Sequence, residues 1–226
     1  MGDYLKERLT GRTNVEFDRI FLIDTCEDDH LAAVGRAFLQ EDGRFGQQNG
    51  NTIAEGICMG SIKAEAENGF VRIYESNILG SLDVDAENGN IELYETKVGK
   101  TAKLSCENGR LFAQALTASE IYTENENGFT ALVDLTSKNT IFAESENGNI
   151  ELSGVEFNVG ATLITENGDI RGSVIGEESD FTFNCVSSRG KCNLENGVSQ
   201  GAKQLNLRSE NGDIEISFLS ESDSKE

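Results

Sequence analysis

A glutamate recurs at one fixed place in a repeated tripeptide, and carboxylates at such a regular spacing could bind cations. The tripeptide Glu-Asn-Gly occurs eight times, and six of its glutamates follow one another at intervals of 19 or 20 residues. They are Glu67, Glu87, Glu107, Glu126, Glu146 and Glu166. We expect these carboxylates to splay into solvent or to bond to turn N–H groups. The alternatives are weak binding of Ca²⁺ or another cation, since Ca²⁺ takes several oxygen ligands, and a strip that docks a basic partner.

The asparagine that follows each of these glutamates has a structural explanation. Asn tolerates the left-handed conformation of a tight corner, and stacked amides can form hydrogen bonds from one repeat to the next. The sequence therefore predicts a ladder of amides that joins the repeats. Its members are Asn68, Asn88, Asn108, Asn127, Asn147, Asn167 and Asn211.

Residue types that commonly carry catalysis are scarce. The chain has one histidine, His30, so a Ser-His-Asp or Cys-His site would depend on it. No Walker loop, metalloprotease helix motif or zinc-spaced cysteine pair occurs. Five cysteines are an odd number, and we expect packed thiols, with a disulfide between Cys185 and Cys192 as the alternative. We therefore expect no catalytic residues, no firmly bound cofactor and a protein that is not an enzyme.

Four apolar residues occupy positions at which the repeat normally faces outward. Tyr122 and Phe142 stand six residues before the glycines of neighbouring repeats. Ile164 and Val186 take the outward position two residues further along in the next two repeats. Exposed apolar patches often mark interaction sites, and aromatic side chains often dominate their binding energy. We expect an apolar stripe that binds a second copy or a different protein, or that the N-terminal segment covers.

All these positions follow from one period of about 20 residues. From Gly50 to Gly168 the repeat glycines stand 19 or 20 residues apart, which indicates one structural coil stacked on the next. Apolar and polar residues alternate on both sides of each Asn-Gly, as in strands with one buried face. Each coil is therefore expected to be a strand, an Asn-Gly corner, a second strand and a second corner often marked by glycine. The absence of proline agrees with a continuous backbone ladder.

Two all-β architectures suit this alternation. Asn-Gly between alternating runs is a strong hairpin signal, but nine hairpins would need about 18 strands, more than open sheets usually hold. The sequence favours a single-chain parallel β-solenoid (β-helix) of about nine coils, with about 20 residues per coil. The spacing from Gly168 to Gly197 is 29 residues, so we place a degenerate coil at Gly190 and expect the coils to stack in sequence order.

The sequence divides into three regions. Residues 1–42 lack the repeat and are expected to form an N-terminal cap, with a strand over residues 15–23 and a short helix over residues 31–40. Residues 43–218 form the solenoid, and residues 219–226 an acidic, disordered tail.

Charge limits the classes of partner. The chain has 40 acidic and 19 basic side chains, for a net charge of −21, which argues against nucleic acid. No apolar run approaches the roughly 20 residues of a transmembrane helix. The first residues lack the apolar region of a signal peptide, so we expect a cytoplasmic protein unless an export signal has been removed.

The eight Glu-Asn-Gly motifs and the 20-residue period, over about residues 43–218, resemble the adhesin-like β-solenoid family. Its members carry recurrent Asn-Gly or Ser-Gly turns between short alternating strands, and the head domains of bacterial adhesins are similar. The resemblance implies surface display, adhesion or envelope sensing, and allows a trimmed cell-surface or envelope protein. We therefore expect a non-enzymatic adhesin-like scaffold or protein-interaction module. The alternative is a carbohydrate-binding or carbohydrate-cleaving β-helix protein that uses outward carboxylates, with a glycan as its partner.

Overall fold

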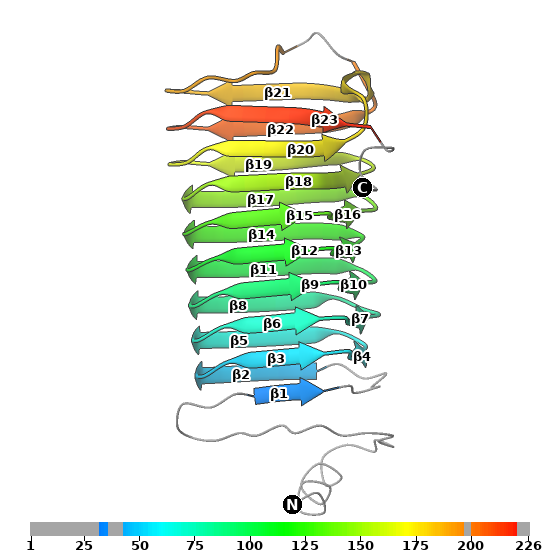
Figure 1. The fold of residues 1–226 in the computed structure, drawn as a ribbon, viewed down its shortest axis with the longest axis vertical. Helices are drawn as coiled ribbons and strands as arrows, with labels where there is room; N and C mark the ends of the chain where they lie inside the picture. The colour runs from blue at the N-terminus through cyan, green and yellow to red at the C-terminus, as the bar shows by residue number, and fades with distance from the viewer. Residues whose placement is uncertain (1–31, 36–42, 197–199, 221–226) are drawn as a thin grey trace, which may run out of the picture.

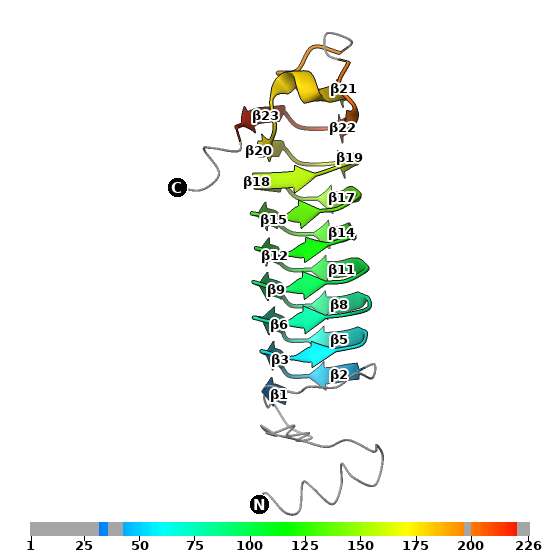
Figure 2. The ribbon, with the colours of Figure 1, turned by 90° about the vertical axis from the view of Figure 1, so that its right-hand side faces the viewer.

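Parallel strands stacked along one axis make up nearly all of the computed structural model, which describes residues 32–35, 43–196 and 200–220 (Figures 1 and 2). Each full coil gives one long strand to a nine-stranded sheet. In spatial order these strands are β2 (Gly43–Asn49), β5 (Ile62–Asn68), β8 (Leu82–Asn88), β11 (Thr101–Asn108), β14 (Glu120–Asn127), β17 (Thr140–Asn147), β19 (Gly160–Thr165), β22 (Lys203–Ser209) and β21 (Phe181–Ser187).

The remaining strands form the other walls of the rod and belong to one 14-stranded sheet. Its larger part contains β1 (Ala32–Gly35), β3 (Thr52–Glu55), β6 (Val71–Tyr74), β9 (Ile91–Tyr94), β12 (Leu111–Gln114), β15 (Thr130–Val133), β18 (Ile150–Phe157), β20 (Ile170–Ile175) and β23 (Ile214–Leu219). A row of two-residue strands joins it through β18: β4 (Cys58–Met59), β7 (Asn77–Ile78), β10 (Lys97–Val98), β13 (Thr117–Ala118) and β16 (Thr136–Ser137).

Every second side chain of these strands points into the rod, as the alternation in the sequence requires. Ile91 and Leu93 of β9 and Leu104 of β11 are wholly buried, and equivalent residues of the other coils stack on them in columns. Burial of one such side chain contributes roughly 1.5–3 kcal/mol to folding. These columns confirm the predicted all-β parallel solenoid.

Six coils have three corners, rather than the two that were expected. The additional corner follows the second strand, where one residue adopts a left-handed conformation with φ between 46° and 62°. Glycine takes this place in two coils, but four coils have other residues there. In chain order the corner residues are Gly56, Glu75, Glu95, Ala115, Asp134 and Gly154. A residue other than glycine, asparagine or aspartate is uncommon at such a φ, so the sequence gives little sign of this corner.

The Asn-Gly corner requires glycine mainly because the stacked backbones approach closely. A Cβ atom on Gly89 would lie 1.4 Å from the carbonyl oxygen of Gly69 in the neighbouring coil. On Gly128 it would lie 1.7 Å from the carbonyl oxygen of Gly109. No side chain can occupy that space, so the glycines of these corners set how closely the described coils can stack.

The expectation that coils stack in sequence order is wrong at the C-terminal end. After β20 the chain forms a short 3₁₀ turn, η1 (Glu178–Asp180), and then β21, before it returns to form β22 and β23. Strand β22 lies between β19 and β21, and pairs with both (Figure 1). The last coil is thus inserted beneath the coil that precedes it in the sequence. As a result, β21 forms the end of the nine-stranded sheet.

The expected helix over residues 31–40 is also corrected in part. Residues Ala32–Gly35 form strand β1, which pairs in parallel with β3 and so continues the stack by one strand. The remaining residues of the expected cap, His30 among them, and residues 221–226 of the expected tail lie outside the described residues.

The cysteines differ from the expectation at one pair. A disulfide joins Cys185 of β21 to Cys192, whereas packed thiols were preferred for this pair. Cys192 follows the corner after β21 and pairs in parallel with Ile214. The disulfide therefore links the two sides of this corner in the end coil. Cys58 and Cys106 are free. Burial raises the pKa of the Cys106 thiol to about 11, so it stays protonated at neutral pH.

Candidate interaction surfaces

The outward side of the nine-stranded sheet, here called the acidic face, carries the row of glutamates. The long strands of neighbouring coils align in register, so the six glutamates of the row stand side by side, and all are exposed. They are Glu67, Glu87, Glu107, Glu126, Glu146 and Glu166. Because β22 is inserted next to β19, Glu210 directly continues the row. Arg208 lies 3.2 Å from Glu210, the one ion pair seen for this row among the described residues.

Like charges affect the titration of this face. Burial, and then the neighbouring carboxylates Glu126 and Glu87, raise the pKa of Glu107. Burial, and then Asp83 and Glu65, raise the pKa of Asp85. Glu65 differs, because hydrogen bonds from Lys63 and Arg44, 2.7 and 3.0 Å away, lower its pKa.

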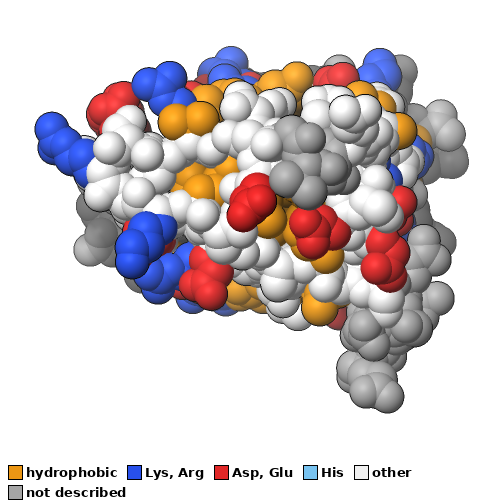
Figure 3. All heavy atoms as spheres, turned by 90° about the horizontal axis from the view of Figure 1, so that it is seen from above, with side chains coloured by type: hydrophobic (Ala, Val, Ile, Leu, Met, Phe, Trp, Pro, Cys, Tyr) orange, Lys and Arg blue, Asp and Glu red, His pale blue; other side chains and the backbone are white. Residues whose placement is uncertain are grey.

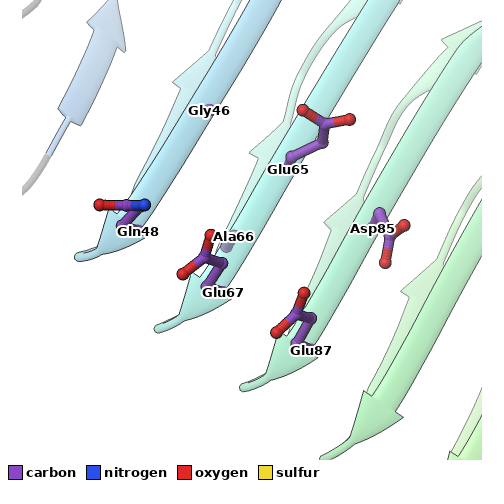
Figure 4. A pocket seen from close by; sticks show the side chains of 7 residues that line it. All are labelled: Gly46, Gln48, Glu65, Ala66, Glu67, Asp85 and Glu87. Carbon is purple, nitrogen blue, oxygen red and sulfur yellow. The ribbon is translucent and has the colours of Figure 1, made fainter.

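A shallow hollow of about 320 Å³ lies at the N-terminal end of the acidic face. Figure 4 shows its lining on β2, β5 and β8, with Gln48, Glu67 and Glu87 in one row and Glu65 and Asp85 beside them. The carboxylates project outward in pairs from β5 and β8 instead of converging on one point. Among the described residues, no three His, Cys, Asp or Glu side chains come together in a way that could hold a metal ion.

Each asparagine of the predicted ladder donates a hydrogen bond to the equivalent asparagine of the neighbouring coil. The Nδ2–Oδ1 distances range from 2.8 Å, for Asn211 and Asn167, to 3.4 Å, for Asn88 and Asn68. Asn49 adds a further member at the N-terminal end, where it accepts from Asn68 at 3.1 Å. At the other end the guanidinium of Arg189 donates to Oδ1 of Asn211 at 2.9 Å, so the last acceptor is satisfied.

A second ladder, not expected from the sequence, runs beside the first. Where the residue after the repeat glycine is Asn or Asp, its side-chain oxygen accepts a hydrogen bond from the backbone N–H in the equivalent place of the neighbouring coil, and Phe70, Arg110 and Phe129 interrupt this ladder. Asn90 accepts in this way from Arg110 at 2.9 Å, and Asp169 from Asp213 at 2.7 Å. The recurrence of Asn or Asp after Asn-Gly was the available signal.

The expected apolar stripe is only partly formed. Tyr122 and Phe142 lie side by side on β14 and β17, with ring centroids 6.2 Å apart, and Tyr122 is 38% exposed. Ile164 lies beside Glu144, one strand beyond Phe142 and two residues along. Val186 is separated from Ile164 by Arg208 of the inserted strand β22, so the four residues do not form one continuous stripe.

A second group of surface aromatic residues was not identified from the sequence. It lies on the opposite wall of the rod, on the outward side of β6, β9, β12 and the corners beside them, and is here called the aromatic face (Figure 2). Its half-buried members are Phe70, Tyr74, Tyr94, Phe112 and Phe129. The signal that could have revealed it is the recurrence of aromatic residues one, three and five positions after the repeat glycine.

The C-terminal end of the rod differs from both walls. In the view onto this end, Lys and Arg side chains lie around the margin and apolar side chains show between polar ones (Figure 3). No helix of the described residues is long and apolar enough to cross a membrane.

Comparison with known proteins agrees with this architecture. The model of the family described as Toastrack DUF4097 matches residues 47–225, which include all full coils except the start of the first. No curated protein and no solved structure matches the chain. Since the family model covers most of its length, the chain belongs to the Toastrack DUF4097 family.

Proposed function

We propose that the protein is a non-enzymatic interaction scaffold whose acidic face binds a basic protein partner. The observation that carries this proposal is the pair of exposed Tyr122 and half-buried Phe142, which lies in the middle of the acidic face. Glu124 and Glu144 stand two residues further along the same strands and face the same way. An aromatic centre with a charged margin is typical of a binding hot spot.

Charge favours a basic partner over a second copy of the chain. Two acidic faces would bring rows of like-charged carboxylates together, at a net charge of −21 for each chain. A partner with lysine or arginine around an apolar residue would contact both the aromatic pair and the carboxylates. The rigid stack presents these groups in a fixed register, which limits the entropy lost on binding. Adhesion would be one biological use of such a scaffold.

A short peptide can test this proposal because the chain contains no tryptophan. The probe is Lys-Trp-Lys with blocked ends. All tryptophan fluorescence then comes from the peptide, and it changes when the peptide contacts the protein. We expect salt-sensitive binding, together with a shift of tryptophan emission to shorter wavelength. The double change Tyr122→Ser and Phe142→Ser should weaken binding by about tenfold or more, since both ring contacts are lost.

Controls separate this interaction from general attraction to an acidic protein. Val159→Ser removes an exposed apolar side chain elsewhere, 52% exposed, and should leave binding unchanged. Glu-Trp-Glu with blocked ends should not bind. Tyr122→Ser alone serves if the double variant does not fold. Equal binding by the double variant and the parent protein, or dimerisation through this face in sedimentation experiments, would contradict the proposal. Selective binding to neutral glycans would instead support the carbohydrate alternative.

A further inference from the structure

We propose that the aromatic face contains a separate binding site for a lysine or arginine side chain of a basic protein segment. The site is a hollow of about 360 Å³ between adjacent coils, here called the tyrosine hollow. It is lined by Arg72, Tyr74, Glu75, Tyr94 and Glu95. Tyr74 and Tyr94 are register partners at the ends of β6 and β9, and both line the hollow.

Both rings are held in place before any ligand arrives. The hydroxyl of Tyr74 donates a hydrogen bond to Oε2 of Glu55 in the preceding coil at 3.0 Å. Tyr94 packs against Phe112 of the following coil, with ring centroids 5.3 Å apart. Burial, and then the hydrogen bond to Glu55, raise the pKa of Tyr74, so its hydroxyl stays protonated at neutral pH. Little side-chain entropy would therefore be lost when a ligand binds.

The aromatic face already binds cations of its own chain. The guanidinium of Arg72 lies 4.9 Å from the ring centroid of Phe70, and that of Arg110 lies 4.6 Å from Phe112 and 5.8 Å from Phe129. Within the described part of the chain, no lysine or arginine lies over the rings of Tyr74 or Tyr94 in this way. The two tyrosines are thus the members of this face at which a cation from outside can make the same interaction.

The charges around the hollow favour a cation. Glu75 and Glu95 are exposed at its margin, and neither makes an ion pair with another described residue. Arg72 does not oppose the ligand strongly, because it is bound to Glu92, with its Nε 2.7 Å from Oε2. Two rings with two free carboxylates match an ammonium or guanidinium group, whereas they would repel a phosphate or carboxylate.

The backbone gives an independent way to test these glutamates. Glu75 and Glu95 have φ of 49° and 46°, a left-handed conformation that is unfavourable for a residue with a Cβ atom. Gly56 and Gly154 occupy the equivalent corner in other coils, so glycine fits there. The two glutamates therefore reduce stability at this corner, while their carboxylates border the hollow.

The experiment uses 3-fluorotyrosine in place of the four tyrosines, which gives one ¹⁹F signal for each ring. Tyr74→Phe and Tyr94→Phe assign the signals, and the signal of Tyr122 reports separately on the acidic face. The probe is Gly-Lys-Gly with blocked ends, and its Nε-acetyllysine analogue is the uncharged control. We expect saturable shifts of the Tyr74 and Tyr94 signals that weaken with salt, and none with the acetylated peptide.

Two double variants separate charge from backbone. Changing Glu75 and Glu95 to glycine should raise the unfolding temperature and weaken binding by about tenfold. Changing both to glutamine should weaken binding to a similar degree without the gain in stability. Ala115→Gly, at the same corner but outside the hollow, should raise the unfolding temperature and leave binding unchanged.

Several results would overturn the proposal. They are unchanged affinity in both double variants, shifts confined to Tyr122, or equal shifts with the acetylated peptide. Because Tyr122 reports on the acidic face and Tyr74 and Tyr94 on the hollow, failure here is distinguishable from failure of the proposed function.

Discussion

The middle coils and the C-terminal end of the rod differ in the order in which their strands stack and in the side chains that fill their core. From β5 to β17 each coil lies on the one before it in the sequence, and equivalent residues repeat in columns of Ile, Leu, Val and Ala. At the C-terminal end, β22 is inserted between β19 and β21. There the core is a cluster of rings, in which Phe181 packs against Phe157 at 5.6 Å and Phe218 at 5.2 Å.

The difference shows what a repeat can and cannot supply. A repeated coil satisfies its neighbours on both sides, but the last one leaves a ladder open. At this end, individual side chains satisfy or cover the groups that a further coil would have paired. Arg189 satisfies the last asparagine, Arg208 pairs with Glu210, and a disulfide ties Cys185 to Cys192. The middle coils therefore depend on repetition, and the end depends on individual contacts.

Removal of residues 200–226 should have the largest effect, because β21 depends on a strand that follows it in the sequence. The deletion removes β22, with which β21 pairs, and buried side chains such as Leu205, Leu207, Ile214 and Ile216. The expected loss is roughly 6 kcal/mol or more of unfolding free energy. Hydrogen exchange should show that β21 loses protection while β8 and β11 keep theirs.

Removal of residues 221–226 alone is the control for this deletion and should change little. Strand β21 would remain protected in the longer deletion if it could pair with β19 directly. That outcome would show that the inserted order is not required.

A Cβ atom at the Asn-Gly corner should be tolerated less in the middle than at the end. Gly89→Ala places a methyl group 1.4 Å from the carbonyl oxygen of Gly69, between coils that are fixed on both sides. Gly190→Ala places it 2.1 Å from that of Gly212, but in the end coil, which can move outward. Urea unfolding should show a loss of about 3 kcal/mol for the first variant and about 1 kcal/mol for the second. Equal losses would mean that the end coil is as constrained as the middle.

The middle coils could be predicted from the sequence because each repeats the same local rules. Alternation placed the buried columns, and the 20-residue period placed the Asn-Gly corners. The inserted end could not be predicted in this way, because Asn211 matches the repeat of Asn167 as well as that of the degenerate coil at Gly190. The pairing of β22 with β19, together with the hydrogen bond from Asn211 to Asn167 at 2.8 Å, decides between them.

The candidate sites show a similar division. The glutamate row, the asparagine ladder and the pair Tyr122 and Phe142 follow from positions within one strand and its register. The tyrosine hollow depends on a corner at which Glu75 and Glu95 stand in place of glycine. Such a corner cannot be recognised in the sequence, because glutamate normally avoids a left-handed conformation and so does not indicate a turn.

The asparagine ladder should contribute more in the middle than at its end. Asn127 donates to Asn108 at 3.1 Å and accepts from Asn147 at 3.0 Å, so Asn127→Ala breaks two hydrogen bonds. Arg189→Ala breaks one, in an exposed pair. We expect losses of about 2 kcal/mol and less than about 1 kcal/mol in unfolding free energy. A smaller loss for Asn127→Ala than for Arg189→Ala would show that the amides stack without stabilising the coils.

The smallest expected effects are electrostatic and have opposite signs in the two regions. In the middle, burial and the carboxylates of Asp83 and Glu65 hold the pKa of Asp85 above its ordinary value of 3.8. Folding therefore favours the protonated form of Asp85. Its contribution to stability is complete below pH 3.8 and is lost as the pH rises through the raised pKa. Asp85→Asn, which stays neutral, should be more stable than the parent protein at pH 7, by less than about 1 kcal/mol.

At the end, Glu210 lies 3.2 Å from Arg208 in an exposed pair, so Glu210→Gln should slightly reduce stability at pH 7. Thermal unfolding of both variants and the parent protein at pH 7 and pH 3.5 measures both signs. The advantage of Asp85→Asn should shrink as the pH falls, because the parent carboxyl becomes neutral as well. High salt should also reduce the part of this advantage that comes from repulsion by Asp83 and Glu65, and leave the part that comes from burial. An advantage that is the same at both pH values would mean that the amide stabilises β8 by its hydrogen bonds and that relief of carboxylate repulsion is not the cause.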